Sequence, residues 1–201
     1  VNVIKNYFSK NGVINMRLLE NDGRGACAAR NTGIRASRGG YIQFFDDDDL
    51  MRENHIKKKV DAIKNSGSDY VACNYAFFDD ETHECVGHKN ISSVKHTCSS
   101  HLLTKSFPCP SFFLKRETMT CIGYWNEEVR KLQDMALFHR LFLHGKKGEF
   151  IEEELFDVRI HNRSMTSFSV TSISGYYERW DAYETIKKAL LRHMTDFLSI
   201  F

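Results

Sequence analysis

A run of four aspartates follows directly on an apolar segment, and this junction constrains the fold more than any other feature of the chain. The apolar segment, residues 41–45, has the length and composition of a buried strand, and the aspartates at 46–49 would emerge where it ends. Adjacent carboxylates repel one another by up to about 1 kcal/mol per close pair in water. In open α/β sheets, ligands bind at the carboxyl ends of strands. The run therefore predicts either a cation site or a solvated charge run that caps the next helix.

Composition describes an ordinary globular protein. The 201 residues are 42% hydrophobic and 27% charged, and the net charge of +2 is too small to indicate a nucleic-acid partner. The six cysteines form no CxxC pair, so we expect reduced thiols in a cytoplasmic protein rather than a zinc site or a disulfide scaffold. We expect neither a signal peptide nor a membrane span, since no apolar stretch approaches the length of one.

The first half of the chain alternates between strand-like and helix-like segments. In chain order, these segments are strand 13–19, helix 26–37, strand 41–45, helix 53–64 and strand 70–78. On the second helix, the expected apolar face consists of Ile56, Val60 and Ile63. The alternation predicts βαβ units around a largely parallel sheet, which is an α/β fold.

The second half is less regular. Residues 79–90 are polar and His-rich, as in a hairpin or a loop, and both prolines lie within residues 107–114, which suits an edge strand or a loop. Residues 131–144 predict a mostly buried helix, and residues 150–160 predict two short strands. The tail, residues 176–201, predicts an amphipathic helix that docks on the parent domain, on a second copy or on a membrane surface.

Three segments, taken in order, form one pattern. The first runs from Ala-Arg-Asn-Thr-Gly at residues 29–33 through a strand into the aspartates. The second is Leu-Gln-Asp-Met-Ala at residues 132–136, and the third is the Arg/His/Ser-rich stretch at residues 158–167. Together they resemble the signature of family 2 glycosyltransferases, in which an ARN-x-G helix precedes a metal-binding D-x-D and a later Glu-Asp motif lies on a helix. The resemblance spans residues 6–167, and its first block is the most specific.

The resemblance implies a GT-A-like α/β fold, with a mostly parallel sheet flanked by helices. It implies a glycosyltransferase domain over residues 1–175, divided into a donor and metal half (1–90) and an acceptor half (91–175), and a separate C-terminal helix (176–201). The family opens with a base-binding strand–helix–strand that ends in Asp-Asp-Gly-Ser, and nothing at the start of this chain matches it. We therefore expect a domain truncated at the N-terminus, through loss of that segment or in a degenerate paralogue.

The family pattern assigns roles to the acidic residues. Asp48 matches the ligand of a divalent cation, Mn²⁺ or Mg²⁺, that would stabilise the diphosphate leaving group of a nucleotide-sugar donor. Asp46 would face the ribose of that donor, with Asp47 in the same donor-binding segment. Asp49 would cap the next helix or orient its neighbours. Asp134 matches the general base that takes the proton from the acceptor hydroxyl, which implies a single-displacement, inverting reaction.

Four other residues have candidate roles. Arg30, near the start of a helix, would pair with the diphosphate or form a salt bridge to one of the aspartates. Gln133 stands where the family has Glu, which keeps the size of the side chain and removes one charge. Arg140 would orient the acidic helix or approach the acceptor. His161 would be a further metal ligand, a phosphate contact or a structural residue.

The leading hypothesis is a metal-dependent, inverting enzyme that transfers a sugar from a nucleotide-sugar donor to a carbohydrate or lipid-linked acceptor. It requires that Asp48 and Asp134 converge on one cleft. The alternative is a catalytically inactive remnant that acts as a binding or scaffold module. We expect a cytoplasmic protein, and the amphipathic tail leaves two further properties open: peripheral association with the inner face of the membrane, and oligomerisation.

Overall fold

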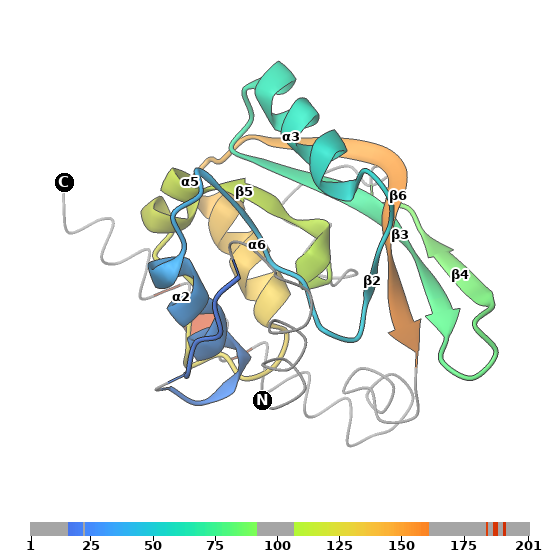
Figure 1. Ribbon diagram of the computed structural model, residues 1–201. Coiled ribbons are helices and arrows are strands. Elements are labelled where there is room, and N and C mark those ends of the chain that lie inside the picture. Colours follow the sequence, from blue (N-terminus) through green and yellow to red (C-terminus); the bar gives the residue numbers. More distant parts are fainter. Residues whose placement is uncertain are drawn as a thin grey trace.

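The computed structural model describes residues 16–21, 23–91 and 107–160, together with residues 184, 187, 188 and 191. These residues form a six-stranded sheet with helices on both of its faces (Figure 1). The strands are β1 (Tyr41–Gln43), β2 (Leu50–Met51), β3 (Tyr70–Asp79), β4 (Cys85–Lys89), β5 (Phe113–Lys115) and β6 (Gly148–Ile160). They lie in the order β1-β5-β3-β6-β2, and β4 pairs with β3. The predicted α/β architecture is confirmed.

The three helices predicted in the described part of the chain are present. They are α2 (Gly25–Ala36), α3 (His55–Ser66) and α6 (Gln133–Leu143). A short helix, α5 (Arg116–Cys121), and a 3-10 helix, η1 (Cys109–Ser111), lie in the second half. The left-handed backbone of Gly67, at φ +67°, and its N–H bond to the Ile63 carbonyl close α3. Among the residues that the structure describes, no helix combines the length and the apolar composition of a membrane span.

The described sheet is mostly antiparallel, so the prediction of a largely parallel sheet is wrong. Of the five strand pairings, only β3–β6 is parallel. β4 follows β3 through a short turn, and short turns join antiparallel neighbours. β1 and β2 lie at opposite ends of the strand order, and each pairs with a strand from the second half of the chain. Residues 16–19, expected to end a strand, belong to none, and residues 13–15 lie outside the described part.

The centre of the core is β3. Its residues Val71 and Ala72 have no exposed surface. Successive side chains of the strand point to opposite faces: Val71 packs with Ile63 of α3, whereas Tyr70 belongs to the cluster that contains Leu137 of α6. Because β3 is covered on both faces, its sequence is a nearly unbroken apolar run.

Two features of the second half differ from the prediction. β6 is one strand of 13 residues rather than two short ones. Its register to β3 shifts near Asn74. Three consecutive glutamates in the middle of the strand interrupt its apolar pattern, so the sequence predicts two strands there. β5 lies between β1 and β3 rather than at an edge. Both prolines precede it, in a loop and in η1, so the loop alternative holds for the prolines themselves. The β3–β4 hairpin confirms the hairpin predicted over residues 79–90.

The buried face of α3 contains a lysine that the sequence pattern did not predict. Ile63 is buried as expected, but Ile56 is 40% exposed and Lys59 is completely buried. The Nζ of Lys59 donates hydrogen bonds to the carbonyl oxygens of Pro110 (2.7 Å) and Ser111 (3.0 Å). Burial lowers the pKa of Lys59 to about 8. A buried amine therefore attaches α3 to η1.

The predicted tail helix, residues 176–201, lies outside the described residues except at four positions. Residues 184, 187, 188 and 191 are helical. The division of the chain at residue 175 and the docking of the tail helix stay predictions.

Candidate functional site

The four aspartates form a turn between β1 and β2. The N–H of Asp49 donates to the carbonyl oxygen of Asp46 at 3.4 Å. Asp47 and Asp48 are exposed, whereas Asp46 and Asp49 are partly buried. The prediction that Asp49 caps the next helix is wrong, because β2 intervenes and Asn54 occupies the cap position of α3. The aspartate turn therefore presents two residues to solvent and keeps two against the protein.

Arg159, near the end of β6, holds the aspartate turn in place. Its Nε donates to the carbonyl oxygen of Asp48 at 2.7 Å, and its backbone N–H donates to Oδ1 of Asp49 at 3.2 Å. The guanidinium also pairs with Asp80 and lies 4.8 Å from the centroid of the Phe78 ring. The sequence gives no signal of this role except its place in the Arg/His/Ser-rich segment. The end of β6 thus fixes the backbone of the turn.

Arg30 of α2 connects the aspartate turn to α6. Its Nη2 forms an ion pair with Oδ1 of Asp46 at 2.9 Å, and its Nη1 donates to Oε1 of Gln133 at 3.4 Å. The guanidinium carbon lies 4.6 Å from the centroid of the Trp125 ring, a cation–π contact. The predicted salt bridge between Arg30 and an aspartate is confirmed. The two acidic segments, which are the aspartate turn (residues 46–49) and the Gln133–Asp134 start of α6, therefore meet at this guanidinium although they are far apart in the sequence.

Asn31, next to Arg30 on α2, fixes the segment that carries Trp125. Its Nδ2 donates to the carbonyl oxygen of Trp125 at 2.9 Å and to Oε1 of Glu127 at 2.8 Å. Its Oδ1 accepts from the N–H of Trp125 at 2.9 Å, so both ends of the buried amide are satisfied. The Ala-Arg-Asn motif therefore has two roles: Asn31 holds α2 against residues 125–127, and Arg30 reaches the acidic side chains.

Asp134 lies in the first turn of α6. Its Oδ1 is fully buried and accepts no hydrogen bond from the described residues. Burial raises the pKa of Asp134 to about 7; the guanidinium of Arg30 opposes this rise, and the carboxylate of Asp46 adds to it. The effect of Asp46 means that the two acidic segments share one electrostatic environment. A carboxyl group with this pKa can exchange a proton with a substrate near neutral pH.

Tyr75 of β3 lies near both acidic segments. Burial raises the pKa of its hydroxyl, and the carboxylates of Asp134 and Asp49 raise it further. Burial is also the main cause that raises the pKa of Asp49, to about 7. The charges of both acids therefore lie close enough to Tyr75 to affect its hydroxyl.

The remaining predicted site residues lie in different places. Arg140 is buried, its Nη1 donates to the carbonyl oxygen of Ile122 at 3.0 Å, and burial lowers its pKa to about 10. This contact fits a role in orienting α6. His161 lies outside the described residues. Within the described ranges, no three His, Cys, Asp or Glu side chains gather into a group that could hold a metal ion.

Comparison with known proteins identifies relatives of this chain. The family model "Glycosyl transferase family 2" matches residues 1–126. Glycosyltransferase GlyG of Streptococcus pneumoniae is 26% identical over 164 residues, which are 75% of this chain and 54% of GlyG. The minor teichoic acid biosynthesis protein GgaB of Bacillus subtilis is 29% identical over 143 residues, which are 68% of this chain and 15% of GgaB. Among solved structures, S. aureus TarS 1–349 in complex with UDP-GlcNAc has a TM-score of 0.60 at 16% identity.

These matches establish the fold and the family. The TarS match covers 88% of this chain and 50% of that chain, and it confirms the predicted GT-A-like fold. The chain spans about half the length of GlyG and of TarS 1–349. The family model covers more than half of the chain, including the Ala-Arg-Asn motif and the aspartate turn. The chain belongs to glycosyl transferase family 2.

Proposed function

We propose that this chain transfers a sugar from a UDP-linked donor to a hydroxyl group of a glycan or lipid-linked acceptor of the cell envelope. Membership of family 2 supports sugar transfer. A UDP-sugar donor is supported by the ligand in the TarS structure, and an envelope acceptor by the name of GgaB. The chain spans about half the length of GlyG, so the identity of the donor and that of the acceptor are both proposed for it. A cytoplasmic site of action at the inner face of the membrane is part of it.

Asp134 is the general base in this proposal. Its carboxylate takes the proton from the acceptor hydroxyl, whose oxygen then bonds to the anomeric carbon while the bond from that carbon to the diphosphate breaks. UDP leaves, and the single displacement inverts the anomeric centre. The buried Oδ1, which no described residue engages, and the raised pKa both support this role.

The aspartate turn fits a divalent cation. Mg²⁺ and Mn²⁺ commonly take one or two protein carboxylates and complete their coordination with substrate phosphates and water. We assign this contact to Asp48, which is exposed and whose backbone Arg159 holds, and we keep His161 as a candidate second ligand. When bound, the cation would supply Lewis-acid stabilisation of the diphosphate leaving group.

Arg30 and Asp46 form the donor side of the site in this proposal. The Asp46 side chain is 40% exposed although it is paired, so it can still accept a hydrogen bond from a ribose hydroxyl. The Arg30 side chain is 16% exposed and already contacts Asp46 and Gln133. These contacts favour a positioning role for Arg30 over direct contact with the diphosphate. Asp47, exposed beside Asp46, is assigned to the same donor side.

The observation that carries the proposal is the contact of Arg30 with Asp46 and Gln133, since it brings both acidic segments to one place. The experiment separates donor binding from transfer. Calorimetry measures UDP binding with and without Mn²⁺, and a second assay measures UDP release from UDP-GlcNAc in the presence of cell-wall glycopolymers. Asp48→Asn should abolish Mn²⁺-dependent UDP binding. Asp134→Asn should keep UDP binding and slow transfer by about 100-fold or more.

Asp61→Asn is the matched control. Asp61 is an exposed aspartate on α3 that pairs with Lys57, so its replacement should change neither binding nor transfer. UDP binding that survives Asp48→Asn, or transfer that survives Asp134→Asn, would contradict the role of that residue. A wild-type chain that binds UDP without transferring sugar would instead support a binding module.

A further inference from the structure

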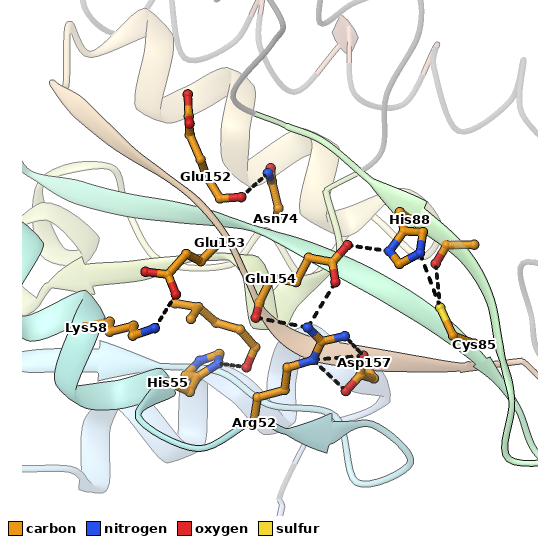
Figure 2. Close-up of polar contacts among 12 residues, drawn as sticks. Arg52, His55, Lys58, Asn74, Cys85, His88, Glu152, Glu153, Glu154 and Asp157 are labelled. Atoms are coloured by element: carbon orange, nitrogen blue, oxygen red, sulfur yellow. Dashed lines mark hydrogen bonds and ion pairs between the residues drawn. The ribbon is translucent and has the colours of Figure 1, made fainter.

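A second cluster of reactive side chains lies on the β3–β4 hairpin. Cys85 begins β4, His88 lies on the same strand, and Glu154 lies on β6; Figure 2 shows His88 between the other two. The Sγ of Cys85 lies 3.6 Å from Nε2 of His88, and Nδ1 of His88 lies 2.6 Å from Oε1 of Glu154. We propose that Cys85 is a site of S-thiolation, at which the thiol forms a mixed disulfide with a small disulfide compound. This proposal does not depend on the proposed function.

A β-bulge makes the arrangement possible. The register between β3 and β4 shifts between Phe77 and Phe78, so Val86 of β4 has no paired residue on β3. On a regular strand, residues three positions apart point to opposite faces of the sheet. The extra residue brings Cys85 and His88 to the same face, and re-aiming a side chain in this way is a common use of bulges.

The bond to Glu154 selects the tautomer of neutral His88. An ionised carboxylate only accepts hydrogen bonds, so in the neutral imidazole Nδ1 carries the proton and Nε2 presents its lone pair to the thiol. Glu154 is itself held by Arg52, whose Nη1 lies 2.9 Å from Oε2, and Arg52 also pairs with Asp157 (Figure 2). Thiol, base and orienting carboxylate are the parts of an activated cysteine nucleophile.

The thiol and the imidazole are both accessible to a small molecule. Cys85 is exposed, and 69% of the His88 side chain is exposed. His88 takes the thiol proton, the sulfur of Cys85 attacks one sulfur of the disulfide, and the disulfide bond breaks. The departing thiolate takes the proton back from His88. The products are the mixed disulfide and one free thiol, so no further oxidant is needed.

The chain contains its own comparison groups. Cys121 of α5 is the other exposed free cysteine of the described part, and its sulfur forms no hydrogen bond with a described histidine. Cys27, Cys73 and Cys109 are buried and should react more slowly than either exposed thiol. His83 lies in the turn of the same hairpin, which makes it a matched control for His88.

The experiment incubates the full chain with oxidised glutathione at neutral pH and follows each cysteine by peptide mass spectrometry. Cys85 should form its adduct at least about tenfold faster than Cys121. His88→Asn should lower the Cys85 rate to that of Cys121 and leave Cys121 unchanged. His83→Asn should leave both rates unchanged, and asparagine suits the positive φ of 58° at that position.

A further variant, Glu154→Gln, tests the orienting carboxylate. It should slow adduct formation at Cys85 without changing Cys121, whose rate also reports whether the fold is intact. The proposal is overturned if Cys85 and Cys121 react at equal rates in the wild type. It is equally overturned if the Cys85 rate survives His88→Asn.

Discussion

Asp134 is a residue whose environment opposes its ionised form. Its Oδ1 is buried without a hydrogen-bond donor among the described residues, and Arg30 only partly offsets the cost of burial. Such a residue destabilises the fold at neutral pH and is useful only if its raised pKa serves a reaction. The proposed proton transfer from an acceptor hydroxyl is such a reaction.

Asp134→Asn should therefore stabilise the folded chain at high pH. The pKa of Asp134 is raised from 3.8 to about 7, so the folded chain binds the proton more tightly than the unfolded chain between these values. Stability from this site consequently falls as the pH rises through that window. Asparagine does not titrate, so the free energy of unfolding at pH 8 should increase by about 1–3 kcal/mol, with little change at pH 4. Urea denaturation at both pH values measures this, and a variant no more stable than the wild type at pH 8 would refute it.

At the scale of elements, α3 is attached to η1 through one buried amine. Lys59→Ala removes the donor to Pro110 and Ser111 and leaves a cavity, so it should cost about 2–4 kcal/mol of unfolding free energy. Lys57→Ala is the matched control on the same helix. Lys57 is 73% exposed, and its loss should change stability by less than about 0.5 kcal/mol. Chemical denaturation at pH 7 measures the unfolding free energy of both variants. A loss for Lys59→Ala as small as that for Lys57→Ala would contradict a stabilising role of the buried amine.

The elements also mark where sequence reasoning succeeds and where it fails. Helices α2, α3 and α6 follow from composition and spacing within a dozen residues, so they are predictable. The position of β5 inside the sheet is not, because it depends on strands β1 and β3, which lie far away in the sequence. The burial of Lys59 is unpredictable for the same reason. A lysine on a helix is expected to be exposed, and the carbonyl groups that bind this one lie far away in the sequence.

At the scale of the whole molecule, the site is assembled from four separate segments. α2 supplies Arg30, the turn after β1 supplies the aspartates, α6 supplies Asp134, and the end of β6 supplies Arg159. Motif resemblance predicts the first three, because each lies in a recognisable local pattern. The roles of Arg159, Asn31 and Tyr75 could not be predicted, since each acts through tertiary contacts that leave no periodic trace in the sequence.

The central claim is that the aspartate turn and Asp134 act on one bound nucleotide sugar. A crystal structure of the chain with Mn²⁺ and UDP-GlcNAc, with the metal located by anomalous scattering, tests it most directly. The account predicts one Mn²⁺ bound by Asp48 and the diphosphate, with the anomeric carbon on the side that faces Asp134. A metal bound away from Asp48, or a sugar that lies far from Asp134, would contradict it.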